Sequence, residues 1–215
     1  MTKEIVLIGA GGHAASIADA IKSSGGSIIG FVDEAKKGEK VLNLDVYSNI
    51  KDLKDFQSYE YVISLGDNSL RQKVLKKSLS EYPDIKFATV IHRTAYVSEY
   101  ATIEKGSVIL GKSFVGPRSY IGNHCIINTG SKIDHDCFLD DFSSTGPGAV
   151  IGGNVKIGRG SIVSIGVTIK HGITIGCNSL IGAMSFLNKD IKSNLIYYGI
   201  PAKEIRSRES DEAYL

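Results

Sequence analysis

The sequence predicts two domains of different fold class, an α/β domain with a small parallel sheet followed by an all-β domain built as a parallel β-helix. Two observations support this prediction. Up to about residue 86, apolar strands alternate with glycine turns and helical patterns. From residue 91 onward, an aliphatic residue recurs at every sixth position. We therefore expect one domain over residues 1–86 and a second, ending in a C-terminal tail, over residues 87–215.

The first domain repeats the order strand, glycine turn, helix. EIVLIGAGGHAASIADAIKSSG starts with an apolar run, and SIIGFVDE supplies a second strand. EYVISLGDNSLRQKVLKKSLSEY then repeats the pattern around Gly66. After the first glycine turn, apolar residues fall at helical spacing, at Ala14, Ile17, Ala18 and Ile21. Strands that alternate with helices indicate a Rossmann-like domain with a parallel sheet.

The second domain has a period of six residues. Fifteen of sixteen successive positions, from Ile91 to Ile181, are Ile, Val or Leu, and the exception is Thr145. The residue four places further on is small or aliphatic each time. This is the hexapeptide repeat of a parallel β-helix. The resemblance to hexapeptide-repeat proteins implies a triangular prism with one hexad per face, about five coils long, with the aliphatic residues inside.

Composition excludes several classes of protein. The net charge of +2 gives no reason to expect a nucleic acid or an anionic membrane as partner. The apolar run from Ile5 to Ile8 is too short for a signal peptide. Cys125, Cys137 and Cys177 are odd in number and lack CxxC spacing, which favours neither a disulfide framework nor a thiolate metal site. We therefore expect a cytoplasmic protein.

The hexad IDHDCF, residues 133–138, carries a candidate catalytic group. Its place in the repeat puts Ile133 and Cys137 inside the prism and His135 outside. A histidine that is not part of the core and has Asp134 and Asp136 as neighbours is a candidate general base, since imidazole changes its charge near neutral pH. Either carboxylate could orient the ring. A solvated surface histidine is the alternative.

The stacking of the coils predicts the neighbours of His135. Gly153 follows one coil later and His171 one coil beyond that. Adjacent strands are about 4.8 Å apart, so the two histidines are expected roughly 9–10 Å apart. Two ligands of one zinc ion must each bring a nitrogen to about 2 Å. The spacing therefore disfavours a metal site like that of the carbonic anhydrases with this architecture, and we expect no metal.

The N-terminal GAGGHA has two interpretations. It follows a strand, opens a helix, and Asp33 comes 24 residues after Gly9, as in the dinucleotide-binding fingerprint of nicotinamide-dependent oxidoreductases. The α/β part is, however, too short for two mononucleotide-binding halves. The pyrophosphate of a nucleotide-linked sugar would suit the same helix N-terminus. A non-catalytic binding protein is a further alternative.

Five short motifs in their order carry a resemblance to a known family. They are VLIGAGGHA at 6–14, FVDE at 31–34, LGDNSLR at 65–71, DHDC at 134–137 and GIPAK at 199–203. With the hexapeptide array, they resemble the bacterial sugar acyltransferases, in which a Rossmann-like domain precedes a left-handed β-helix. That family includes N-acetyltransferases acting on nucleotide-linked 4-amino sugars, as in bacillosamine and perosamine biosynthesis, and sialic acid O-acetyltransferases.

The resemblance implies an acetyl-CoA-dependent enzyme, active as a homotrimer, and a role for particular residues. His135 matches the general base and Asp136 the acidic residue beside it. Ser144 stands where some relatives carry a histidine that contacts acetyl-CoA. The remaining matches are backbone contacts to acetyl-CoA and positions around the nucleotide-sugar acceptor. The cofactor positions are Gly153, Ile165 and Ala183, and the acceptor positions are Gly11, Gly12, His13, Asp33, Glu34 and Gly66.

The expected reaction needs an uncharged nucleophile to attack a thioester, and a histidine base serves an amine or a hydroxyl. The pyrophosphate-binding turn and the acidic end of the second strand favour a nucleotide-linked 4-amino sugar over free sialic acid, which has neither pyrophosphate nor base. The sequence predicts an N-acetyltransferase, with a sialic acid O-acetyltransferase as the alternative.

Overall fold

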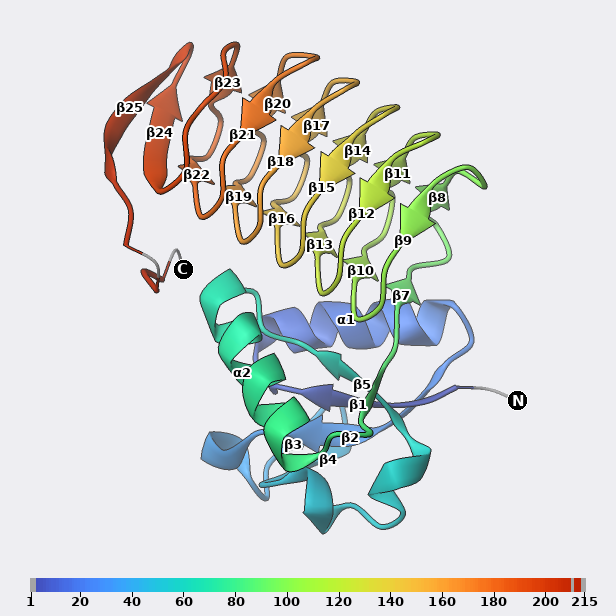
Figure 1. The fold of residues 1–215 in the computed structure, drawn as a ribbon. Helices are drawn as coiled ribbons and strands as arrows, with labels where there is room; N and C mark the ends of the chain where they lie inside the picture. The colour runs from blue at the N-terminus through green and yellow to red at the C-terminus, as the bar shows by residue number, and fades with distance from the viewer. Residues whose placement is uncertain (1–2, 210, 214–215) are drawn as a thin grey trace.

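The computed structural model describes residues 3–209 and 211–213, and shows an α/β domain under a β-helix (Figure 1). The two expected domains extend slightly beyond the described residues, which do not include residues 1–2, 210 and 214–215. Over the described part of the chain, no helix is long and apolar enough to cross a membrane.

The α/β domain has a sheet in the order β3-β4-β2-β1-β5-β6. The pairs β1–β2, β1–β5, β2–β4 and β5–β6 are parallel, and β3–β4 is antiparallel. The strands are β1 (Glu4–Ile8), β2 (Ser27–Val32), β3 (Lys40–Val41), β4 (Leu44–Tyr47), β5 (Glu60–Ile63) and β6 (Lys86–Phe87). The helices are α1 (Gly12–Ser23), α2 (Asn68–Glu81), and the 3-10 turns η1 (Glu34–Lys36), η2 (Ile50–Asp52) and η3 (Phe56–Ser58).

The predicted helical pattern after the first glycine turn is confirmed by α1. Its apolar residues at positions 14, 17, 18 and 21 are buried. They pack into one cluster with Val90, Val108 and Leu110, which lie on the outside of the β-helix. The apolar face of α1 is therefore covered partly by the second domain.

The β-helix consists of parallel strands that form a prism over the described residues, and β25 adds one antiparallel strand at its C-terminal end. We call its sides the domain face, the second face and the third face. The domain face is β7 (Val90–Ile91), β10 (Val108–Ile109), β13 (Ile126–Ile127), β16 (Ser144–Thr145), β19 (Ile162–Val163) and β22 (Leu180–Ile181), continued by β24 (Leu195–Gly199) and β25 (Ala202–Ser207). The second face is β8 (Tyr96–Val97), β11 (Phe114–Val115), β14 (Lys132–Ile133), β17 (Val150–Ile151), β20 (Thr168–Ile169) and β23 (Phe186–Leu187). The third face is β9 (Thr102–Ile103), β12 (Tyr120–Ile121), β15 (Phe138–Leu139), β18 (Lys156–Ile157) and β21 (Thr174–Ile175).

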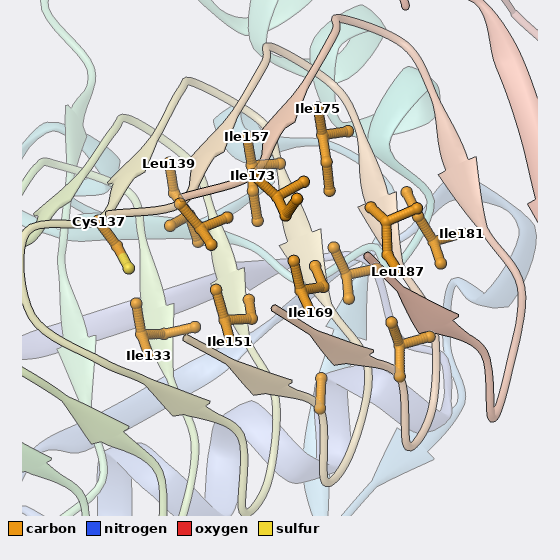
Figure 2. Packing of buried hydrophobic residues seen from close by; sticks show 14 of the residues in the cluster. Ile133, Cys137, Leu139, Ile151, Ile157, Ile169, Ile173, Ile175, Ile181 and Leu187 are labelled. Atoms are coloured by element: carbon orange, nitrogen blue, oxygen red, sulfur yellow. The ribbon is translucent and has the colours of Figure 1, made fainter. Parts of the chain in front are cut away.

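The core of the prism matches the predicted hexapeptide pattern. Every predicted inward position from Ile109 to Ile181 is buried, including Thr145, and Cys125 and Cys137 fill the small inward positions. Figure 2 shows Ile133, Ile151, Ile169 and Leu187 in one row. The first coil differs, because no coil precedes it. Ile91 is 36% exposed, and Val97 and Ile103 are half-buried.

The α/β domain lies against the domain face, as Figure 1 shows for α1 beside β7 and β10. We call the edge between the third face and the domain face the docking corner, because Asn68 and Arg71 of α2 hydrogen-bond to residues 124, 142, 160 and 161 there. The edge between the second and third faces, which includes residues 134–137 and 152–155, is called the outer ridge. The outer ridge is the edge of the prism that does not border the domain face.

Candidate functional site

His135 lies on the outer ridge, in the turn between β14 and β15. Its side chain is 48% exposed, so it is not part of the core, as predicted. The turn places Asp136 at a φ of 58°, and the Asp136 amide donates to the carbonyl of Pro117 at 3.0 Å. A left-handed residue at this place turns the chain sharply from the second face to the third face, and it brings the side chains of His135 and Asp136 together.

The carboxylate of Asp136 holds the imidazole of His135. Its Oδ2 is 2.6 Å from His135 Nδ1, and Arg118 donates to both carboxylate oxygens at 2.6 Å. The hydrogen bonds from Arg118 and His135 lower the pKa of Asp136 to about 2. Because an ionised carboxylate only accepts, Nδ1 carries the proton of the neutral ring, which leaves Nε2 as the basic atom.

Of the two neighbouring carboxylates, Asp136 is the one that contacts the ring. Asp134 Oδ1 instead accepts the backbone N–H of His135 at 2.8 Å. The arrangement fits a base with an orienting acid, the division of roles found in His–Asp pairs of hydrolases. Sequence reasoning missed Arg118. Its signal was available, since Arg118 stands one coil before Asp136.

Gly153 lies directly beside His135, as the coil spacing predicted. A Cβ on Gly153 would stand 2.6 Å from Cε1 and 2.7 Å from Nε2 of His135. Only glycine leaves room for the ring in this position. On the next coil, Gly172 donates its N–H to the carbonyl of Gly153 at 2.9 Å, which keeps His171 one coil further from His135. Among the described residues, no group of three or more His, Cys, Asp or Glu side chains could hold a metal ion.

The predicted acetyl-CoA positions lie along both edges of the second face. Gly153 is on the outer ridge, whereas Ile165 and Ala183 are exposed on the edge between the second face and the domain face. Ile165 and Met184 are joined across adjacent coils by a backbone hydrogen bond of 2.8 Å. A long cofactor would therefore have to follow the second face to reach all three. Their contact with acetyl-CoA stays a prediction.

Ser144 stands apart from these residues. It lies on the domain face, is 3% exposed, and its hydroxyl donates to Asn68 Oδ1 at 2.9 Å. A contact between this hydroxyl and acetyl-CoA would require the hydrogen bond to Asn68 to be broken. The predicted cofactor role of Ser144 stays untested, and the structure gives it a different partner.

The predicted acceptor residues gather at the carboxyl ends of β1, β2 and β5. Asp33 and Glu34 line a cavity of about 590 Å³ with Gly9 and Leu65. Ligands of open α/β sheets bind at this edge. Asp33 accepts the N–H of Ala10 at 3.0 Å and so fixes the first glycine turn. The carboxylate of Asp33 therefore already has a structural partner.

The glycine turn itself is open. Gly11 precedes α1 as its N-cap, and Gly12 is the first helical residue. A Cβ on either would meet nothing within 4 Å, so a ligand can approach the helix N-terminus closely. His13 follows with its Nε2 buried and without a hydrogen-bond partner among the described residues. Burial, and then the charge of Arg71, lower the pKa of His13 to about 4, so its ring is neutral at pH 7.

The structure does not bring the base and the acceptor residues together within one chain. His135 is on the outer ridge, whereas His13 and Gly66 lie beside Arg71, which bonds to the docking corner. The third face of the prism lies between these two edges within one chain.

Comparison with known proteins agrees with this fold. Residues 4–78 match the family model of the PglD N-terminal domain. A GDP-perosamine N-acetyltransferase of Escherichia coli O157:H7 is 26% identical over 182 residues, which cover 82% of this chain and 81% of that protein.

Two solved structures resemble the whole chain. A histidine-to-alanine variant of a GDP-perosamine N-acetyltransferase from Caulobacter crescentus, in complex with CoA and GDP-perosamine, is 27% identical with a TM-score of 0.89, covering 96% of this chain and 99% of the other. The acetyltransferase domain of PglB from Neisseria gonorrhoeae, in complex with acetyl coenzyme A, is 29% identical with a TM-score of 0.88, covering 95% and 100%. The predicted fold class, an α/β domain followed by a left-handed parallel β-helix, is confirmed, and the chain is similar over nearly its full length to sugar N-acetyltransferases, with a PglD-type N-terminal domain at residues 4–78.

Proposed function

We propose that the protein transfers an acetyl group from acetyl-CoA to the 4-amino group of a nucleotide-linked sugar. The observation that carries the proposal is the exposed His135–Asp136 pair over Gly153. It combines a base, an acid that orients it and a glycine that makes room for it. The Caulobacter relative, which binds CoA and GDP-perosamine, supports the choice of both substrates.

In the proposed reaction, His135 Nε2 accepts a proton from the amine as the amine attacks the thioester carbon. A C–N bond forms, the C–S bond breaks, and the imidazolium can return the proton to the leaving thiolate. Asp136, ionised because of Arg118, holds the Nδ1 proton and stabilises the imidazolium. Gly153, whose backbone lies beside the ring, would donate its N–H to the developing oxyanion.

The acceptor would bind through the α/β domain. Its pyrophosphate suits the N–H groups at the start of α1, where Gly11 and Gly12 leave open space. Its base and ribose suit the 590 Å³ cavity, where Asp33 and Glu34 present carboxylates to N–H and O–H donors. We accordingly assign residues 1–86 to the acceptor and residues 87–215 to acetyl-CoA, with Ile165 and Ala183 as contacts.

We further propose that the enzyme works as a homotrimer with its active sites between copies. The separation of His135 from the glycine turn within one chain supports this. Stacked aromatic pairs are found on two different sides of the prism, Tyr96–Phe114 on the second face and Tyr120–Phe138 on the third, and all but the half-buried Tyr120 are exposed. Different patches that meet in a head-to-tail contact generate closed rings.

Subunit mixing tests the shared site. His135→Ala removes the base, and Gly11→Asp places a negative charge where the pyrophosphate is expected while keeping a good N-cap. Each variant alone should be inactive. If the site is shared, co-refolding equal amounts should restore about a quarter of the wild-type rate, because each site draws its two halves independently. No recovery, or an active monomer by light scattering, would refute the shared site.

The substrate is tested by following thiol release from acetyl-CoA with UDP-4-amino, GDP-4-amino and sialic acid acceptors in parallel. Turnover with a nucleotide-linked amino sugar is expected. If only sialic acid, free or CMP-linked, supports turnover, the enzyme is an O-acetyltransferase, since the His–Asp pair can serve a hydroxyl too.

We place the reaction in the cytoplasm. The three cysteines are unpaired thiols, with Cys125 and Cys137 buried in the prism. Free thiols are typical of a reducing compartment. Fractionation of cells that carry a tagged chain would check this.

A further inference from the structure

A buried polar network joins the two domains. Asn68, Arg71 and Ser144 are 1%, 1% and 3% exposed. Arg71 belongs to α2 and extends into the docking corner. Its Nε donates to His124 O at 3.0 Å, one terminal nitrogen donates to Leu65 O at 3.0 Å and Gly66 O at 2.8 Å, and the other donates to Asn68 Oδ1 at 2.7 Å and Phe142 O at 3.2 Å. These five bonds match the five N–H donors of a guanidinium.

Asn68 is equally engaged. Its Nδ2 donates to Gly160 O at 3.1 Å and to Ser161 O at 3.2 Å, while its Oδ1 accepts from Arg71 at 2.7 Å and from Ser144 at 2.9 Å. An amide can make two donations and two acceptances, so its capacity is filled. Ser144 supplies the last of them. The network is complete only with a small hydroxyl at that position.

Most acceptors in the network are backbone carbonyls from separate segments. Two belong to the turn after β5 and four to the docking corner on successive coils. A fully bonded buried network allows one arrangement, since any shift leaves a buried donor or acceptor unpaired. Arg71 therefore fixes the Leu65–Gly66 turn directly onto the β-helix. The same guanidinium contributes to keeping His13 neutral.

We propose that Asn68, Arg71 and Ser144 are positioning residues that set the acceptor-binding turn on the β-helix, and so determine where the sugar amine lies relative to the base of the neighbouring copy. The inference rests on the proposed function. None of the three need touch a substrate, because they act through the backbone of the turn. Ser144, at a position where some relatives carry a histidine that contacts acetyl-CoA, would here act on the acceptor side instead.

The test compares two variants with a matched control. Ser144→Ala removes one hydrogen bond of Asn68. Arg71→Lys keeps the charge, but an ammonium cannot reach five acceptors. Ser113→Ala is the control, because Ser113 is 2% exposed and its hydroxyl donates to Asn128 O at 2.9 Å, away from the network. Ser144→Ala should lower kcat/KM for the acceptor about threefold to tenfold, and Arg71→Lys about a hundredfold. The KM for acetyl-CoA and the thermal midpoint of Ser144→Ala should equal those of the control.

The other outcomes overturn the inference. A raised KM for acetyl-CoA in Ser144→Ala would return this residue to the cofactor. If Ser144→Ala lowers kcat/KM equally for the acceptor and for acetyl-CoA, and Ser113→Ala does the same, the network has a structural role only. If the kinetics of Ser144→Ala are unchanged, Ser144 has no positioning role. If no acceptor in the panel is acetylated, the proposed function is refuted. Amide hydrogen exchange then still tests whether the network positions the turn. Residues 65–68 should exchange faster in Ser144→Ala than in the wild type or in Ser113→Ala, and unchanged exchange contradicts the network's positioning role.

Discussion

The outer ridge and the domain face are built from the same hexapeptide repeat, yet they treat polar residues in opposite ways. On the outer ridge, the side chain of His135 is 48% exposed, and within the described part of the chain it hydrogen-bonds to its neighbour Asp136 alone. On the domain face, Ser144 is 3% exposed and bonds to another domain. The repeat decides which residues point outward. What covers each face decides whether an outward residue is available to a substrate.

The outward positions of the domain face show this most clearly. Five of them are apolar and buried, and Ser144 is the polar exception. The apolar ones are Val90, Val108, Ile126, Ile162 and Leu180. The equivalent positions of the second face include Tyr96, Phe114 and Val150, which are exposed in one chain. The covered face therefore carries the α/β domain, and the outer ridge stays open, as the proposed catalytic role of His135 requires.

The largest effect is expected from removing the base on the open ridge. His135→Ala should reduce kcat by about 10²–10⁴-fold, because the variant loses general-base catalysis, while the oligomeric state and thermal midpoint stay unchanged. His171→Ala is the matched control, since His171 takes the same outward place two coils later and is exposed. Steady-state kinetics check the pair. If both variants acetylate at the wild-type rate, the outer ridge is not the catalytic side.

The next effect is expected at Gly153. In Gly153→Ala the new Cβ would stand 2.6 Å from the His135 ring. The ring is the mobile end of a side chain, so it moves and stability changes little, but a base displaced by about 1 Å costs roughly a hundredfold in rate. The double variant with His135→Ala should be no slower than His135→Ala alone. An additional loss there would mean that the new methyl group also occupies space that the thioester needs, and that displacement of the ring is not the whole effect.

The sequence predicted the β-helix well because the period of six residues determines whether each side chain points into the prism or outward. An inserted residue would have moved every later aliphatic residue out of the core, so the register could be followed from Ile109 to Ile181 and carried over to His135 and Gly153. The α/β domain was predicted only as elements, because local patterns set α1 and its buried face but not which loops form a cavity. Asp33 and Glu34 came from a resemblance, and Ile91 failed because the pattern does not mark the open end of the prism.

The interface between the domains was not predicted, although it left signals. The apolar outward residues on every third hexad indicated a covered face, and Ser144 interrupted them. Arg71 and Asn68 were read as part of a family motif. Their roles depend on carbonyls of residues 124, 142, 160 and 161, and no local pattern relates α2 to those coils. Long-range pairing of this kind is visible only in three dimensions.

A smaller effect is expected from the acid beside the base. Asp136→Asn removes the charge that holds the Nδ1 proton and the partner of Arg118, and should lower kcat about tenfold to a hundredfold, less than loss of His135. Asp134→Asn is the control, because an amide oxygen can still accept the N–H of His135, and its rate should stay within about twofold. A greater loss in Asp134→Asn would mean that the exposed pair is oriented by the other carboxylate.

The smallest effect on catalysis concerns the histidine on the buried side. His124 is 2% exposed, stacks on Phe142 and contacts Phe87, and burial together with Arg71 lowers its pKa to about 4. The unfolded chain binds a proton near the ordinary pKa of 6.5, so the stability that the neutral ring contributes is complete above that pH and falls as the pH drops toward 4. Between pH 7.5 and 5, one such group lowers the free energy of unfolding by about 2 kcal/mol. His124→Gln should flatten this part of the stability curve, measured by thermal unfolding at each pH, and leave kcat at pH 7.5 near that of the wild type. An unchanged slope in His124→Gln would mean that the buried ring does not carry this pH dependence.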